Sequence, residues 1–248
     1  MRRKFIAGNW KMYGTQKEVE SLLKALKVGL AHFLDTDVAV FPSFVHLQQA
    51  RDLLQDSPIG FGAQNLNAHD TGAYTGEISG LMLKDLGCHY VLVGHSERRQ
   101  LFGETDAIIA EKFAAALKHQ LTPVLCVGET QAERENNQTE SVVLAQLQAV
   151  LDKVGIDAFS KAIIAYEPVW AIGTGLTATP AQAQAVHAFI RARLAEHNAP
   201  LAQALRIVYG GSVKGSNAAE IFSQPDVDGG LVGGASLKAE EFVTICRS

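Results

Sequence analysis

Glu167 stands at the end of an apolar run of residues and is followed directly by Pro168. Such a run is typical of a strand buried on both faces, so the carboxylate would lie at the border of an apolar interior. Burial disfavours the charged form and can raise the pKa of a carboxyl group toward the range of a general base. The pattern therefore predicts a catalytic base, although a solvated glutamate in an ordinary strand-to-helix loop also fits it.

The segment after Glu167 suggests a lid beside that base. Pro168 stiffens the exit from the strand, while Gly173 and Gly175 allow backbone conformations that other residues resist. A helix start follows at Thr179, with proline at the first helical position. The two glycines would then act as hinges of a short uncharged loop.

Asn9 and Lys11 follow the first predicted strand and are two residues apart, so alternation places both on one side of an extended segment. Lys11 is either a cation held in a site or a surface residue. His95 and Glu97 follow the fourth predicted strand. Backbone dipoles at a helix start disfavour imidazolium, which favours a neutral His95, but a purely structural histidine is the alternative. A catalytic role for His95 therefore requires that it share one site with Lys11 and Glu167.

Two glycine-rich turns follow the last two predicted strands, Gly210-Gly211-Ser212 and Gly233-Gly234. Glycine permits close approach to the backbone, whose free N–H groups can bind an anion. In barrels of alternating strands and helices, these loops often hold phosphate. Each pair alone is an ordinary turn, but together on adjacent strands they favour a phosphate site. No nucleotide-binding GxxxxGK[ST] sequence is present.

The elements that must position these residues alternate regularly along the chain. Eight short apolar runs read as strands, and each is followed by a helical segment without a linker or low-complexity tract. Such alternation predicts parallel strands with right-handed crossovers, and eight units in one chain of this length predict a single (β/α)8 TIM barrel over residues 1–248. A doubly wound open sheet is the competing architecture. The predicted strands are Phe5–Gly8, Val38–Phe41, Ile59–Ala63, Tyr90–Val93, Pro123–Val127, Ala162–Tyr166, Arg206–Tyr209 and Gly229–Val232.

Composition excludes several classes of protein. The net charge is −4 at neutral pH, and the chain lacks the basic patch of a nucleic-acid-binding protein. No window of residues is long and apolar enough for a membrane span, and no signal peptide is recognisable. Three cysteines, Cys88, Cys126 and Cys246, lack the paired spacing of a disulfide framework. We therefore expect a cytoplasmic protein with reduced thiols.

The types of residue at the strand ends argue against two kinds of catalytic site, a metal site and a Schiff-base lysine. The ends of the strands carry no group of residues with metal-ligand spacing, and no lysine lies inside a strand, which argues against a Schiff-base aldolase. One carboxylate, one histidine, one lysine and an anion site suit proton transfer next to a carbonyl of a small phosphorylated sugar. The alternatives are a non-catalytic phosphate-binding protein on the same barrel and a different phosphosugar enzyme.

Five motifs resemble the triosephosphate isomerase family and occur in its order along the chain. They are Ala7–Met12 (AGNWKM), Gly94–Arg99 (GHSERR), Ala165–Gly175 (AYEPVWAIGTG), Tyr209–Ser212 (YGGS) and Leu231–Ala235 (LVGGA). The resemblance implies reversible interconversion of dihydroxyacetone phosphate and glyceraldehyde 3-phosphate, as in glycolysis and gluconeogenesis, without a cofactor or metal.

The resemblance also implies roles for individual residues. Glu167 matches the base, His95 the electrophile that moves protons between the two substrate oxygens, and Lys11 the cation that favours the anionic substrate. Asn9 helps to position the site, and Glu97 is a carboxylate near the lysine whose role is less settled. The residues that match phosphate contacts are Gly173, Ser212, Gly233 and Gly234, next to Asn9 and Lys11.

The lid and the dimer contact are likewise implied by the resemblance. The matching lid residues are Pro168, Val169, Trp170, Ala171, Ile172, Gly173, Thr174, Gly175, Leu176, Thr177 and Ala178. The polar loop 64–77 is similar to the family's dimer loop, whose Thr75 reaches toward the partner's active site, so we expect a homodimer. Leu176 departs from the family pattern, since many members carry lysine there, and Gly80-Leu81 replaces a commoner proline-containing turn. Cys126 is similar to a cysteine that packs beside the base.

Overall fold

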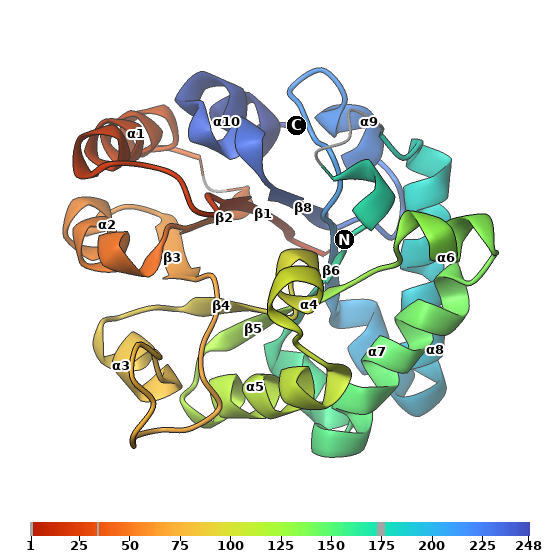
Figure 1. Cartoon of the computed structure of the whole chain (residues 1–248). Coiled ribbons are helices and arrows are strands. Elements are labelled where there is room, and N and C mark those ends of the chain that lie inside the picture. Colours follow the sequence, from red (N-terminus) through yellow and green to blue (C-terminus); the bar gives the residue numbers. More distant parts are fainter. Residues whose placement is uncertain (1, 34, 173–176) are drawn as a thin grey trace.

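The computed structural model describes residues 2–33, 35–172 and 177–248 of the chain. Eight parallel strands close into a barrel in which each strand pairs with its neighbours in the sequence and β8 pairs with β1 (Figure 1). The predicted (β/α)8 barrel is confirmed, and the open sheet is excluded because an open sheet has no pairing between its first and last strands. The strands are β1 (Lys4–Asn9), β2 (Thr36–Phe41), β3 (Ile59–Ala63), β4 (Tyr90–Val93), β5 (Thr122–Val127), β6 (Ile163–Tyr166), β7 (Arg206–Tyr209) and β8 (Gly229–Val232).

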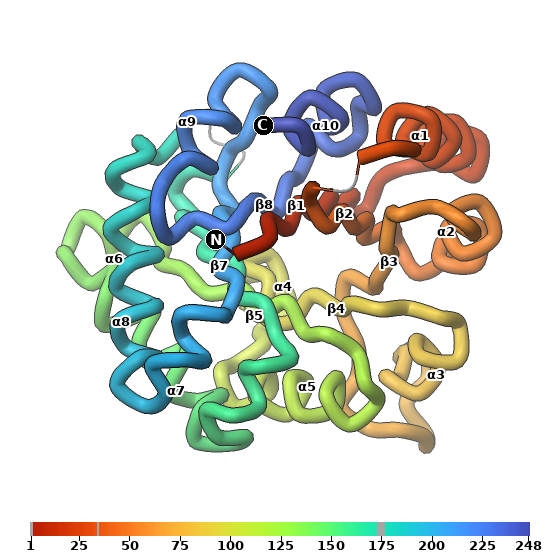
Figure 2. The backbone as a smooth tube through the Cα atoms, turned by 180° about the vertical axis from the view of Figure 1, so that it is seen from behind, coloured from red at the N-terminus to blue at the C-terminus, as the bar shows by residue number. Residues whose placement is uncertain are grey.

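Helices surround the barrel and cover its outer face (Figures 1 and 2). The α-helices are α1 (Gln16–Gly29), α2 (Leu47–Leu54), α3 (Gly80–Asp85), α4 (Ser96–Phe102), α5 (Asp106–Lys118), α6 (Gln131–Glu135), α7 (Thr139–Val154), α8 (Pro180–Ala204), α9 (Ala218–Phe222) and α10 (Ala239–Cys246). Within the described residues, the short 3-10 helices η1 (Phe44–His46), η2 (Ile156–Lys161), η3 (Val169–Ala171) and η4 (Gly234–Leu237) complete the connections. Within the described residues, no helix is long and apolar enough to cross a bilayer.

The core has two parts because side chains alternate along each strand. In β1, Phe5 and Ala7 point into the barrel, where they belong to a cluster with Phe41, Leu92 and other interior side chains. Ile6 lies between them on the opposite side, in the larger cluster between strands and helices. Strands buried on both faces explain why the strands read as continuous apolar runs. The interior is thus filled, and polar chemistry is confined to the ends of the barrel.

Capping boxes define the starts of three helices that follow strands. Thr15 and Glu18 cap α1, Thr130 and Glu133 cap α6, and Thr179 caps α8 with Gln182 three residues later. In each box the threonine hydroxyl accepts a backbone N–H of the first turn, and the later side chain accepts the N–H of the threonine. These signals lie close in sequence, and the helix start predicted at Thr179 is confirmed.

The segment after Thr130 contains two helices separated by a turn. The segment forms the short helix α6 and then α7, which begins at Thr139. Asn137 lies between them in the left-handed region, with φ 57°. Asparagine tolerates that conformation better than most residues, so the chain turns there before α7 starts. The last helix also begins later than predicted, at Ala239 after η4.

Closure between β8 and β1 requires glycine at position 229. Gly229 has φ 127°, and a Cβ atom there would lie 2.1 Å from the carbonyl oxygen of Phe5. We expect Gly229→Ala to lower the free energy of unfolding by about 3 kcal/mol or more, because strain and a backbone clash add. Urea denaturation at fixed protein concentration measures the change.

Gly155 provides a matched control for that substitution. Its φ of 74° is also positive, but a Cβ atom there would have no heavy atom within 4 Å. Gly155→Ala should therefore cost only about 1–2 kcal/mol, which is the backbone strain alone. Equal losses in the two variants would show that the close approach of β8 to β1 contributes nothing.

Candidate active site

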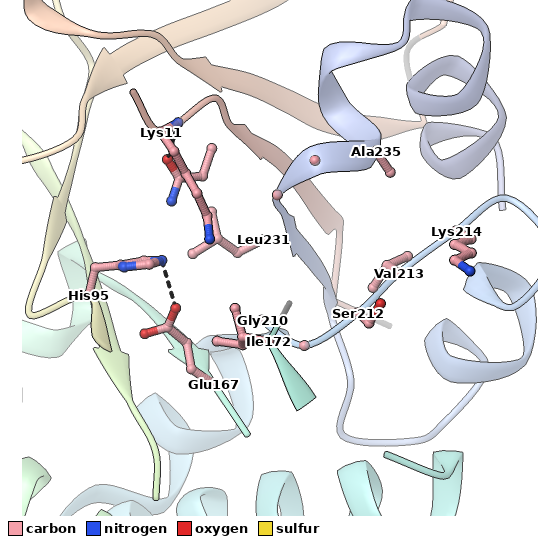
Figure 3. Close-up of a pocket in the computed structure, with 14 residues that line it drawn as sticks. Lys11, His95, Glu167, Ile172, Gly210, Ser212, Val213, Lys214, Leu231 and Ala235 are labelled. Carbon is pink, nitrogen blue, oxygen red and sulfur yellow. Dashed lines mark hydrogen bonds and ion pairs between the residues drawn. The ribbon is translucent and has the colours of Figure 1, made fainter. Parts of the chain in front are cut away.

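A cavity of about 250 Å³ opens where the strands end, and the candidate residues from distant parts of the sequence meet in it. Lys11 follows β1, His95 follows β4 and Glu167 follows β6, and all three side chains line this one cavity (Figure 3). The remaining lining consists of Asn9, Ile172, Gly210, Gly211, Ser212, Val213, Lys214, Leu231, Gly233, Gly234 and Ala235. The predicted meeting of Lys11, His95 and Glu167 in one site is therefore observed.

The carboxylate of Glu167 is 2% exposed and accepts two hydrogen bonds. Its Oε1 lies 2.9 Å from Nε2 of His95, and its Oε2 accepts the backbone N–H of Ser96 at 2.9 Å. Burial raises the pKa of this carboxyl group, but His95, the Ser96 N–H and the charge of Lys11 together outweigh it, so the pKa lies below its ordinary value. The upward shift that burial alone would give to the pKa is thus offset here by donors and a positive charge from other parts of the chain.

His95 is held in one orientation by its two ring nitrogens. Nδ1 accepts the backbone N–H of Glu97 at 3.2 Å, which leaves the proton on Nε2 facing Glu167. Burial lowers the pKa of His95, while the neighbouring carboxylate raises it and gives a net upward shift. The Glu97 N–H opposes that shift, because protonation of Nδ1 would remove its acceptor. The geometry places Nε2 as the donor to Glu167, and the neutral state of His95 stays a prediction.

Lys11 lies in the left-handed backbone region, with φ 52°, and points into the cavity. Its Nζ lies 2.5 Å from Oε1 of Glu97, and its backbone N–H donates to Oδ1 of Asn9 at 3.0 Å. Glu97 thus neutralises a cation that lines the cavity without lining the cavity itself. The surface alternative for Lys11 is excluded by this position, since its side chain is only 23% exposed.

Ser212 lies across the cavity from His95 (Figure 3), and the predicted phosphate residues Gly233 and Gly234 line the same cavity. Ser212 follows β7, and Gly233 and Gly234 follow β8. A Cβ atom on Gly233 would lie 3.6 Å from Cε of Lys11, so the glycine turn and the lysine face the same space. Gly173, the fourth predicted contact, lies outside the described residues.

Comparison with known proteins decides the family. The family model described as triosephosphate isomerase matches residues 4–248. A triosephosphate isomerase of Nitrosococcus oceani is 56% identical over 248 residues, which cover all of this chain and 99% of the relative. Relatives of the same name from Thiobacillus denitrificans and Nitrosomonas eutropha are 56% and 54% identical, over 100% and 99% of this chain and 99% and 97% of their own lengths. The chain belongs to the triosephosphate isomerase family. It is therefore an isomerase, and the predicted resemblance is confirmed.

Two side chains that support Lys11 in this family member were not predicted. The carbonyl oxygen of Lys11 accepts the hydroxyl of Ser43 at 2.9 Å and the amide of Gln64 at 2.7 Å. Gln64 also donates to the carbonyl oxygen of Phe41 at 2.8 Å. Left-handed backbone is costly for lysine, and these bonds from the loops after β2 and β3 hold it there. The sequence signal for both residues is their place directly after a strand, which they share with the candidate residues after the other strands.

A buried carboxylate, Glu129, anchors the first part of the predicted lid and was also missed. Glu129 is fully buried and follows β5, and its Oε1 accepts Nε1–H of Trp170 at 3.0 Å and the hydroxyl of Tyr166 at 3.1 Å. Arg134 neutralises it at 3.1 Å and covers the ring of Trp170. Of the predicted lid, Pro168–Ile172, Thr177 and Ala178 are described, whereas Gly173, Thr174, Gly175 and Leu176 lie outside the described residues.

Thr75 does not line the cavity of its own chain and lies exposed in loop 64–77. Hydrogen bonds fix the loop in place. Asn67 donates to Glu77 within the loop at 2.7 Å, and Asp70 accepts from Lys118 and His119 at the end of α5. Asn65 and Ser79 at its ends are buried, so the loop projects from a fixed base.

The hydrogen bond from His95 predicts the pH response of Glu167. Because the pKa of Glu167 is lowered from 4.5, the carboxylate persists as pH falls until below that value, and Glu167 should cause no inflection between about pH 5 and 7 in kcat/KM. In His95→Ala the burial of Glu167 remains while one donor is lost, so the pKa of Glu167 should rise.

Carboxyl ¹³C NMR titration of glutamate-labelled protein measures that pKa directly. His69→Ala is a suitable control, because His69 stacks on Tyr74 in loop 64–77 and lies outside the cavity. It should leave the Glu167 titration unchanged. An unchanged Glu167 pKa in His95→Ala would mean that the hydrogen bond does not stabilise the carboxylate.

Proposed function

We propose that this chain interconverts dihydroxyacetone phosphate and D-glyceraldehyde 3-phosphate, with Glu167 as the base that moves the proton between the two carbons. Membership of the triosephosphate isomerase family makes the chain an aldose–ketose isomerase and supports a phosphorylated triose as substrate. The observation that carries the residue roles is the buried Glu167 carboxylate 2.9 Å from Nε2 of His95, in a cavity shared with Lys11.

The mechanism begins with an exchange of hydrogen bonds. In the structure without substrate, the Nε2–H of His95 donates to Glu167. When a substrate carbonyl oxygen accepts the Nε2–H of His95 instead, the buried carboxylate of Glu167 loses one of its two donors. The pKa of Glu167 then rises, so the base becomes stronger when the substrate carbon is in reach.

Proton transfer then follows in balanced steps. Glu167 takes the proton from the carbon next to the carbonyl, and the electron pair of that C–H bond forms the enediolate. Nε2 of His95 donates its proton to one substrate oxygen and recovers one from the other, and Glu167 returns its proton to the neighbouring carbon. Lys11 stabilises the negative charge that develops on the oxygens. All protons move between substrate and side chains, so the reaction as proposed uses neither a cofactor nor a metal.

The phosphate end of the substrate is assigned to the turns after β7 and β8. We assign Ser212, Gly233 and Gly234 as contacts of the phosphate, with Gly173 from the lid, and Asn9 as a residue that orients Lys11. Glycine leaves backbone N–H groups accessible to an anion. The lid 168–178 would close over the enediolate and exclude water, which protects it from loss of phosphate.

Glu167→Asp tests the assigned base. The shorter side chain withdraws the carboxylate by about 1 Å, and turnover should fall on the order of 100-fold, because proton transfer depends steeply on position. The measurement is a coupled assay of glyceraldehyde 3-phosphate formed from dihydroxyacetone phosphate. Asp152→Asn, exposed on α7 and outside the cavity, should keep parental turnover per active site. Near-parental turnover in Glu167→Asp would remove Glu167 from the mechanism.

We further propose a homodimer formed through loop 64–77 and its neighbours. Large apolar side chains are exposed on the segments that follow β1, β2, β3 and β4, which are adjacent around the barrel. They are Met12, Tyr13, Phe44, Val45, Tyr74, Leu81, Met82, Leu101 and Phe102. A contiguous apolar surface of this kind favours a protein partner, and a second copy with Thr75 at the partner's site is the family expectation.

Two valines of equal exposure test the dimer. Val45 is 80% exposed on the proposed surface, and Val28 is 81% exposed on α1, outside it. Val45→Arg should weaken dimerisation by about 10- to 100-fold, because it places an unpaired charge in an apolar contact. Sedimentation velocity over a dilution series measures this, with Val28→Arg unchanged. Equal behaviour of both variants, or a monomeric parent, would contradict the proposed surface.

We place the chain in the cytoplasm. Its three cysteines are odd in number and lack paired spacing, which suits a reducing compartment. Cys126 lies inside the barrel, where burial and the charge of Glu167 raise the pKa of its thiol well above the ordinary value. A thiol held protonated in this way serves packing beside the base rather than chemistry.

A further inference from the structure

One cation at the cavity has no role in the mechanism proposed above. Lys214 lines the cavity from the turn after β7 and is exposed. Figure 3 shows it beyond Ser212 and Val213, on the side of the cavity away from His95. Among the residues that the structure describes, no carboxylate forms an ion pair with its ammonium group.

The backbone around Lys214 is fixed although its side chain is exposed. Its N–H donates to Oδ1 of Asn217 at 2.8 Å, and its carbonyl oxygen accepts the N–H of Asn217 at 3.1 Å. The next residue, Gly215, donates its N–H to Oε1 of Glu241 at 2.8 Å. The turn therefore keeps this lysine at the rim of the cavity, while its ammonium group stays in solvent.

The charges that surround the cavity explain what such a lysine would do. The charge of Lys11 is balanced by Glu97 at 2.5 Å, and Glu167 adds a negative charge that His95 does not cancel as a neutral ring. The whole chain carries a net charge of −4. A phosphate monoester carries nearly two negative charges at neutral pH. Without another cation, both the cavity and the chain would repel the substrate of the proposed reaction.

We propose that Lys214 attracts the phosphorylated substrate to the cavity by its charge at the rim, without taking part in the chemical step. This inference rests on the proposed function. A charge at the rim of a site changes the rate at which a charged substrate binds, and the salt dependence of that rate, more than it changes the stability of the bound complex. Lys214 would thus favour phosphorylated over neutral trioses and raise kcat/KM but not kcat.

Removal of the charge tests this assignment. Lys214→Gln should lower kcat/KM for glyceraldehyde 3-phosphate on the order of two- to fivefold at about 10 mM ionic strength, where the Debye length is about 30 Å. The ratio of parent to variant should approach one at about 1 M salt, where that length is about 3 Å. Lys214→Arg should behave as the parent, and kcat should be equal in all three proteins.

A substrate without phosphate separates attraction from a structural effect. For D-glyceraldehyde, parent and Lys214→Gln should have equal kcat/KM, because the neutral triose has no charge to attract. The control for general charge is Lys161→Gln, since Lys161 is exposed in η2, before β6, at the end of the barrel opposite the cavity. It changes the net charge equally and should leave kcat/KM at low salt within measurement error of the parent.

Three outcomes would overturn the inference. A deficit that is the same at low and high salt, or one that also appears with D-glyceraldehyde, would assign Lys214 a structural role. An equal deficit in Lys161→Gln would mean that net charge alone matters. Parental kcat in Lys214→Gln keeps the proposed function intact in each of these cases. A parent chain that does not isomerise the phosphorylated triose would overturn the proposed function, and this inference with it.

Discussion

The buried charge of Glu167 is the constraint on which the rest of the site depends. A carboxylate away from water is costly unless donors surround it, and here His95 and the Ser96 N–H supply two hydrogen bonds from the segment after β4. Glu167 itself follows β6, and the pairing of β4 with β5 and of β5 with β6 brings base and donors to the same end of the barrel. These two donors stabilise the carboxylate and so make it a weaker base. In the proposed mechanism the substrate competes for one of them, the Nε2–H of His95.

Lys11 carries the second constraint, which is strain in the backbone. Its left-handed conformation is maintained by a hydrogen bond from its N–H to Asn9, at the end of β1, and by bonds that Ser43 and Gln64 donate from the segments after β2 and β3. These segments also carry the exposed apolar side chains of the proposed dimer surface. The position of the cation and the shape of that surface therefore depend on the same three loops, which links the site to assembly.

The fold was predictable from sequence because its signals are local. Buried strands and the helix start at Thr179 and Pro180 depend on neighbouring residues, and the described structure contains them as predicted. The turn at Asn137 has no such local signal, because asparagine permits the left-handed conformation without requiring it. The net shift in the pKa of Glu167 could not be read from the sequence, because its donors lie 71 or more residues away. Glu129 was missed because its role depends on Trp170, which approaches only in the folded barrel.

Glu129 also holds the chain between the base and the lid. The N–H of Glu167 donates to the carbonyl oxygen of Val127 at 2.7 Å, and the N–H of Val169 donates to that of Glu129 at 3.1 Å. Pro168 lies between these two anchors, and its ring restricts φ, so few backbone rotations separate Val169 from the base. The buried Glu129 therefore fixes the chain on the lid side of Glu167, while His95 and the Ser96 N–H fix its carboxylate.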